Sequence, residues 1–129
     1  VKYWMDDFAR LIEARAVIHD DSKLREPEKS CFDTWTPNLK QVEFGSDDYK
    51  TALLNMGEGL KSHYANNSHH PEHYPSGIDG MTLYDLVEMY CDWLAAAQAK
   101  NQPIDLGYLS KRFKISPQLA GIILNTLKE

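Results

Sequence analysis

The sequence is poor in cysteine, with only two in 129 residues. Cys31 and Cys91 lie far apart and form no CxxC or CxxxC spacing, so neither a zinc knuckle nor a disulfide framework is indicated. We therefore expect a reducing compartment, most simply the cytoplasm. We also expect Cys91 to pack in the core, where free cysteine behaves as a small apolar side chain.

Long apolar runs and an excess of basic charge are also lacking. No stretch approaches the run of about 18 apolar residues that spans a bilayer, and no charged and then apolar leader opens the chain. Fourteen Lys and Arg stand against 19 Asp and Glu, which gives a formal net charge of -5. This balance disfavours nucleic acid and anionic membranes as partners and suits a small-molecule ligand. The length fits one domain, residues 1–129, able to bury a core without a structural metal.

No alternating pattern typical of β-strands is present, and apolar residues instead recur every three or four positions, so we predict an all-α fold. Amphipathic helices are expected over 2–18, from Ser46 to Tyr64, and from Met81 to Ala99. Ser46 and Thr82 are the predicted N-caps of the last two. The stretch 24–46 contains two prolines and predicts only a short helix and a loop.

Residues 105–129 predict two short helices, roughly 105–113 and 117–128, joined at "KISPQ". The segment "YLSKRFKISPQLAGIILNTL" is similar to a helix-turn-helix, but its loose pattern and the acidic chain favour two helices that pack on the bundle. The apolar end of this tail would permit a homodimer.

Histidine is concentrated in one stretch. "HYANNSHHPEHYPSGIDG", residues 63–80, holds four of the five histidines. Polar loops collect Asn, Ser, Pro and Gly for their turns, whereas histidine is the commonest metal ligand among side chains. A helical scaffold can direct such ligands from distant segments to one point. The candidate metal ligands are His19, Asp20, His63, His69, His70 and Asp92.

Each of these groups also has an ordinary interpretation when taken alone. His19 and Asp20 could simply end a helix, and His63 could be a buried core histidine. Asp85, Glu88 and Asp92 form an acidic stripe that is typical of a solvated helix face. If Asp92 is a ligand, that stripe must instead face a polar pocket beneath the 63–80 loop.

The ordered motifs "HDDSK" (19–23), "HHPEH" (69–73) and "EMYCDW" (88–93) resemble the HD-domain superfamily of metal-dependent phosphohydrolases. The superfamily is an all-α fold named for its adjacent His-Asp pair. The chain is more closely similar to an uncharacterised bacterial and phage family with HDxSK, HHPEH and EMxxDW segments. The resemblance covers roughly residues 1–100 and implies an HD-like helical bundle with the short C-terminal helices packed on it.

The resemblance assigns roles to the candidate ligands. It matches His19 and Asp20 with the defining pair and Asp92 with the late Asp, and it allows Asp20 to bridge two metals. The remaining three histidines match those that two-metal members add. The superfamily's first ligand is a histidine on the first helix, and residues 1–18 contain none. We therefore expect that histidine ahead of Val1.

The implied activity is hydrolysis of a small phosphorylated molecule, such as a nucleotide, with one or two divalent transition metal ions (Fe, Mn, Zn, Ni or Co). Lys23 would offer a compact positive charge to a phosphate, and Glu72 or His73 would relay protons to the leaving group. Two alternatives stay open. HD-like proteins with a di-iron pair oxygenate their substrates with a similar ligand list, and a non-catalytic module could bind a metal, a nucleotide or a protein partner.

Overall fold

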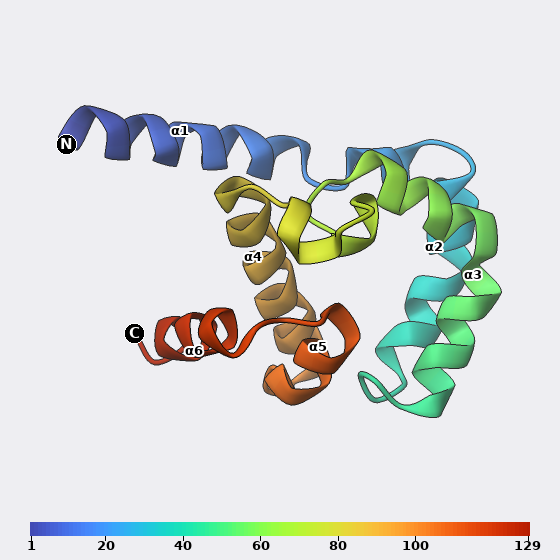
Figure 1. The fold of residues 1–129 in the computed structure, drawn as a ribbon. Coiled ribbons are helices and arrows are strands. Elements are labelled where there is room, and N and C mark those ends of the chain that lie inside the picture. Colours follow the sequence, from blue (N-terminus) through green and yellow to red (C-terminus); the bar gives the residue numbers. More distant parts are fainter.

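The computed structural model describes residues 1–129 as six α-helices and three short 3₁₀-helices, with no β-strand (Figure 1). The predicted all-α class is therefore confirmed, and each helix predicted along the chain is present. In chain order the elements are α1 (Lys2–Ile18), η1 (Asp21–Leu24), α2 (Glu28–Lys40), α3 (Asp47–Asn66), η2 (Pro71–His73), η3 (Gly77–Gly80), α4 (Leu83–Lys100), α5 (Leu106–Phe113) and α6 (Pro117–Thr126).

Both predicted N-caps are confirmed. The Ser46 hydroxyl accepts a hydrogen bond from the backbone N–H of Tyr49 and so begins α3. Thr82 begins α4 with a reciprocal pair: its hydroxyl accepts from the N–H of Asp85, and the Asp85 carboxylate accepts from the N–H of Thr82. These bonds satisfy backbone donors that a helix start leaves free.

Helix α2 is longer than the short helix and loop predicted for 24–46, and that prediction was wrong in extent. Pro27 stands just before its first residue, and α2 then runs through Pro37 to Lys40. It lies side by side with α3 (Figure 1). Helix packing of this kind outweighs a proline's local preference against helix.

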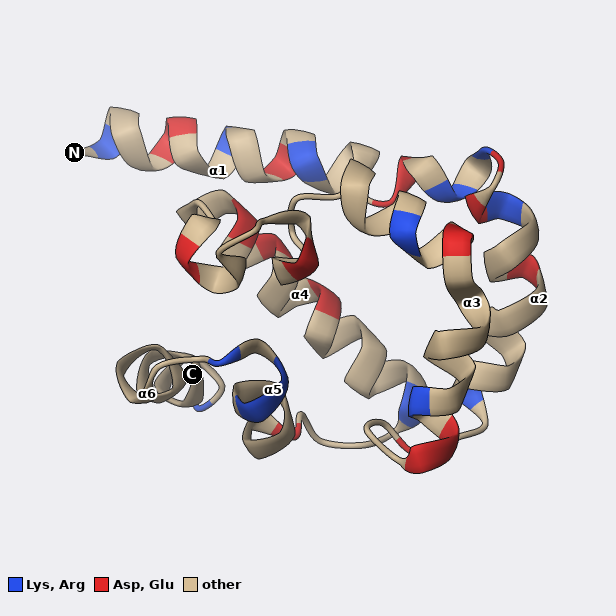
Figure 2. Ribbon diagram, turned by 45° about the vertical axis from the view of Figure 1, so that its right-hand side comes forward, with Lys and Arg blue, Asp and Glu red and all other residues tan.

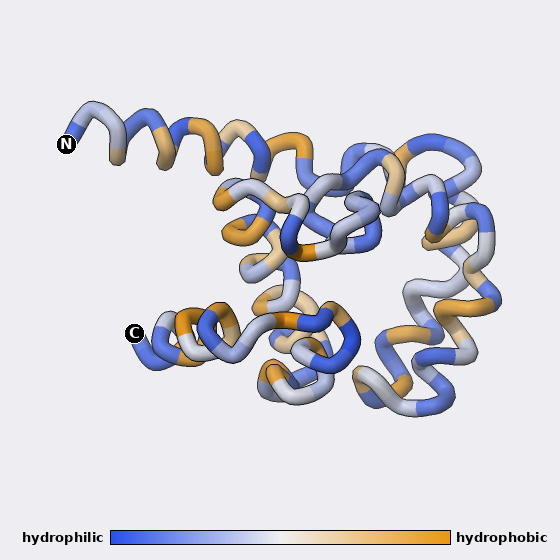
Figure 3. The backbone as a smooth tube through the Cα atoms, in the orientation of Figure 1, coloured by the Kyte–Doolittle hydropathy of each residue, from blue (hydrophilic) through white to orange (hydrophobic).

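The hydrophobic core joins α4 to the tail. Met89 and Trp93 of α4 pack with Leu109 of α5, Ile115 of the following turn and Ile123 of α6. Hydrophobic segments recur along α4 and α6 (Figure 3). The tail helices therefore pack on the bundle.

Helix α4 has the orientation that a ligand role for Asp92 requires, with its acidic residues away from solvent. Asp85 is only 2% exposed, whereas Leu83 is 68% exposed and Cys91 lies at the surface. The prediction of a core Cys91 was therefore wrong. Figure 2 shows the acidic residues of α4 between its start and its middle, close to the loop that carries η2 and η3. The acidic stripe is thus no solvated face, because it is turned toward this loop and toward α1.

Helix α1 lies across the start of α4, and its N-terminal half projects beyond the rest of the protein (Figure 1). None of its residues is fully buried. It is fixed near its end, where Arg15 reaches Asp85 and Glu88 at 2.6 Å each. None of the six helices combines the length and the apolar character needed to cross a membrane.

Candidate metal centre

The turn after α1 presents the first two candidate ligands. His19 ends the helix with an extended backbone conformation (φ -52°, ψ 125°), and Asp20 follows in the left-handed region (φ 58°, ψ 19°). Asp and Asn tolerate this region better than most residues with a side chain. The reversal at Asp20 directs its carboxylate toward the end of α3 and the loop beyond it.

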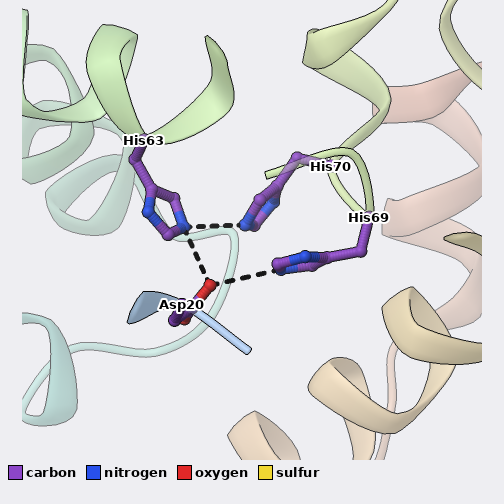
Figure 4. Close-up of side chains that lie close together, drawn as sticks. All are labelled: Asp20, His63, His69 and His70. Atoms are coloured by element: carbon purple, nitrogen blue, oxygen red, sulfur yellow. Dashed lines mark hydrogen bonds and ion pairs between the residues drawn. The ribbon is translucent and has the colours of Figure 1, made fainter. Parts of the chain in front are cut away.

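The Asp20 carboxylate meets three histidines (Figure 4). Its Oδ1 atom lies 3.4 Å from Nε2 of His63 and 3.5 Å from Nε2 of His69. The Nε2 atoms of His63 and His70 are 2.9 Å apart. One donor atom from each of the four residues lies within 4.8 Å of the others, which is a spacing that a single metal ion can bridge.

The second oxygen of Asp20 faces the other two candidates. Oδ2 lies 3.5 Å from Nε2 of His19, and that nitrogen lies 3.8 Å from Oδ1 of Asp92. The structure thus gathers all six residues predicted as metal ligands around one carboxylate. The two oxygens of Asp20 face different members of the set.

Two polar atoms of this cluster are buried without a hydrogen-bond partner: Oδ1 of Asp20 and Nε2 of His69. Leaving a buried acceptor or donor unpaired costs about 1–3 kcal/mol, so such atoms are rare in folded proteins. Here the two atoms face one another across 3.5 Å. An oxygen and an imidazole nitrogen are the donors that late first-row metal ions bind.

The opposite ring nitrogens of two histidines share one carboxylate. Oε1 of Glu88 lies 2.8 Å from Nδ1 of His19 and 3.1 Å from Nδ1 of His69, and its Oε2 accepts from Arg15. A carboxylate at Nδ1 holds the proton there and leaves Nε2 free as a lone-pair donor. Glu88 therefore orients two imidazoles toward Asp20.

Glu28 orients the His63 ring in the same way, through its Nδ1 atom. Its Oε2 atom lies 3.0 Å from Nδ1 of His63, and the carboxylate also accepts hydrogen bonds from Ser22 at 2.6 Å and Ser62 at 2.8 Å. Glu28 is 1% exposed. A buried carboxylate with these partners is a fixed acceptor, so the His63 ring is held with Nε2 toward the cluster.

The protonation of the histidines differs across the cluster. The carboxylates of Asp92 and Glu88 raise the pKa of His19 to about 10, so an ion that binds its Nε2 atom would have to displace a proton. Burial, together with the neighbouring His69 and His63, lowers the pKa of His70 to about 3. The His70 ring is therefore neutral, which is the form that ligates a metal.

With the geometry described, comparison with known proteins adds one finding. The model of a family of unknown function, DUF5662, matches residues 1–129. The chain belongs to the DUF5662 family. No match was found among curated proteins or among solved structures.

The residues predicted to act on substrate in this DUF5662 chain fall into two groups. Lys23 lies beside the cluster, with Nζ 2.6 Å from Oδ2 of Asp20 and 4.6 Å from the centre of the Phe32 ring. Glu72 and His73 are exposed on η2. The first pairs with Arg112 and the ring of the second bonds to the carbonyl oxygen of Tyr64, so the structure does not bring either into the cluster.

Three residues around the candidate site escaped prediction from sequence as parts of it. Glu28 stands in an unremarkable charged stretch, and Glu88 had been assigned only to the acidic stripe. Arg112 lies on α5, beyond the region that the resemblance covers. The one available signal was the four-residue spacing of Glu88 and Asp92, which places both on one helix face.

Proposed function

We propose that this DUF5662 protein is a metal-dependent phosphohydrolase of the HD type that acts on a small phosphate ester. The observation that supports this most directly is the pair of unpartnered buried atoms, Oδ1 of Asp20 and Nε2 of His69, inside a cluster of imidazole nitrogens. A bound cation would satisfy both atoms. The ordered motifs of the sequence support the same proposal independently.

Asp20 would be the central ligand, since its two oxygens face different donors. His63 and His70 would hold an ion on the Oδ1 side, and His19 with Asp92 would hold one on the Oδ2 side. His69 is within reach of Oδ1 and lies against the His19 ring, with the ring centres 4.5 Å apart. We infer that Nε2 of His69 joins this set of ligands on the Oδ1 side.

Divalent ions held there would act as Lewis acids toward a phosphoryl oxygen and lower the pKa of water to near neutrality. The chain's own residues would position the reactants. Glu88 and Glu28 fix the rings, and the Lys23 ammonium, which donates one N–H to Oδ2 of Asp20, keeps two N–H donors for a phosphoryl oxygen. Such fixed donors stabilise charge without reorganising during the reaction.

The proposal is tested by the metal content of protein purified without a histidine tag or added metal, measured by elemental mass spectrometry. His70→Ala removes a cluster histidine, and His73→Ala is the matched control because that ring lies outside the cluster. We expect one or two transition metal ions per chain, reduced in H70A and retained in H73A. The metal-loaded protein should hydrolyse a simple aryl phosphate and lose this activity in chelator.

A protein that holds no transition metal after incubation with Mn, Zn, Ni, Co and Fe would overturn the proposal. Bound iron with oxygen consumption and no ester hydrolysis would overturn the hydrolase function and favour the di-iron oxygenase. Metal content that is equal in wild type and H70A would place the ion elsewhere.

A further inference from the structure

A cavity of about 150 Å³ adjoins the candidate metal centre. Four of the candidate ligands line one side of it: Asp20, His63, His70 and Asp92. Twelve of its eighteen lining residues are hydrophobic, with aromatic rings from α2, α3 and the end of α5 among them. A substrate that reaches the metals through this cavity therefore meets a wall that is mostly apolar.

Only two lining residues carry a positive charge, Lys23 and Arg112. Lys23 is paired with Asp20, as described above. Arg112 comes from a different element, α5, the short helix whose basic residues are visible in Figure 2. The cavity thus has a cation of the chain at each of two separate places.

Arg112 is held in place but keeps donors free. Its Nη2 donates to Glu72 at 2.9 Å and to the Tyr64 hydroxyl at 3.3 Å, and its guanidinium carbon lies 4.6 Å from the centre of the Phe113 ring. Its Nε and Nη1 atoms have no partner in full hydrogen-bond geometry, although the Tyr49 hydroxyl lies close to the guanidinium. A guanidinium that is fixed on one side and free on the other matches two phosphoryl oxygens at once.

Tyr64 links Arg112 to the cluster. Its ring centre lies 5.1 Å from that of His70, while its hydroxyl accepts from Arg112. Arg112 is therefore one side chain away from a candidate metal ligand.

The charges in the cavity favour an anion once metal is bound. Without metal, the lining carboxylates of Asp20 and Asp92 balance Lys23 and Arg112, and Glu72, which does not line the cavity, also pairs with Arg112. Each divalent ion adds two positive charges in a partly closed, mostly apolar space, where electrostatic attraction is stronger than in water.

We propose that Arg112 binds the anionic phosphoryl group of the substrate, and that this substrate is a phosphate ester with an apolar or aromatic organic part rather than a sugar phosphate. The inference rests on the proposed function of the metal centre, and it names the residue and the substrate class that the cavity selects.

The test measures the affinity of inorganic phosphate for the metal-loaded protein by calorimetry, in wild type, Arg112→Gln, Arg112→Lys and Lys111→Gln. Lys111 is the matched control, because it is the neighbouring cation on α5 and is exposed outside the cavity. We expect R112Q to weaken phosphate binding by about tenfold or more with unchanged metal content. R112K should recover only part of this loss, because ammonium lacks the planar fork, and K111Q should bind as wild type does.

R112Q with wild-type affinity would overturn the assignment, and so would a wild type that binds no phosphate. If circular dichroism shows that R112Q is unfolded, the phosphate affinity of R112K is the test. Wild-type affinity in R112K would overturn the argument from the planar guanidinium, and weaker binding would support it. The substrate class is tested by the KM of phenyl phosphate against that of glucose 6-phosphate. We expect phenyl phosphate to have the lower KM by about tenfold, and equal values would overturn the apolar selection.

These outcomes are separable from the proposed function. A wild type that binds phosphate in an Arg112-dependent way but hydrolyses no ester would refute the hydrolase and leave Arg112 as the anion-binding residue. Hydrolysis that is lost in H70A but unaffected by R112Q would support the hydrolase and refute the role of Arg112.

Discussion

Glu28 holds Nδ1 of His63 at 3.0 Å, although 35 residues separate the two in the chain. Both side chains are buried, on α2 and α3 respectively. Because this contact sets which nitrogen of His63 faces Asp20, α2 contributes to the candidate metal centre without supplying a candidate ligand.

Glu28→Gln tests this contact. The neutral amide is a weaker acceptor for the Nδ1 proton, and loss of such an outer partner typically lowers metal affinity by about tenfold to a hundredfold. A competition titration with a chromophoric chelator measures it. Glu26→Gln is the control, since Glu26 is exposed and bonds only to Ser30. Equal metal affinity in wild type and E28Q would show that Glu28 does not orient the ligand.

Removing metal should destabilise the protein. An ion that binds only the native state stabilises it by about 2.7 kcal/mol at a free concentration a hundred times its Kd. We expect a lower Tm in chelator than in excess metal for wild type and for His73→Ala. His69→Ala should reduce or abolish the difference, because it removes one of the two unpartnered buried atoms. A Tm of wild type that chelator leaves unchanged would contradict the metal centre.

Asp85 should make stability depend on pH in acid. Burial alone would raise the pKa of its carboxyl, but hydrogen bonds from Ser68 and Thr82 outweigh it and lower the pKa from 3.8 to about 2. Because the pKa of Asp85 is lower in the folded than in the unfolded state, the ionised carboxylate stabilises the fold. This contribution is fully present above about pH 4 and is lost as the pH falls toward 2. The pKa difference between the folded and unfolded states corresponds to about 2 kcal/mol of unfolding free energy.

Urea unfolding between about pH 7 and pH 2 measures this effect. Asp85→Asn should lose about 2 kcal/mol at neutral pH and show a flatter decline in acid. Asp79→Asn is the control, because Asp79 is exposed on η3. A decline in D85N as steep as that of wild type would assign the acid sensitivity to other carboxylates.

The contact between α2 and α3 should tolerate no side chain at Gly59. A Cβ atom there would lie 2.3 Å from Cβ and 2.4 Å from Sγ of Cys31, which is far inside contact distance. Gly59→Ala should therefore cost about 1–3 kcal/mol of unfolding free energy, as overpacking does. Gly121→Ala on α6 meets no atom within 4 Å and should stabilise by up to about 1 kcal/mol. Thermal unfolding of both variants measures these effects. A G59A variant with the Tm of wild type would show that α2 and α3 move apart at little cost.

The sequence was enough to predict the helices because their caps and apolar spacing are local signals. Ser46 and Thr82 begin α3 and α4 as expected. The full length of α2 was not predictable, because Pro37 argues locally against helix and only packing on α3 keeps the helix intact.

The residues that cluster around Asp20 were also predicted from the sequence, since histidine is rare in polar loops and the motifs occur in a recognisable order. The residues that orient them were not found. Glu28 and Arg112 look like surface charges in the chain, and only the tertiary fold shows one buried against His63 and the other lining the cavity. The burial of Asp85 likewise depends on how α4 is rotated, which an amphipathic pattern with acids on one face leaves open.

The left-handed backbone at Asp20 limits which amino acids position 20 can accept. Glycine, asparagine and aspartate adopt such a conformation most readily, and most other side chains strain the turn. Of these three, aspartate alone carries a carboxylate. The substitutions that would best preserve the turn after α1, to glycine or asparagine, are therefore the ones that remove the central charge of the cluster. The backbone conformation and the need for a carboxylate are separate constraints on position 20, and aspartate satisfies both.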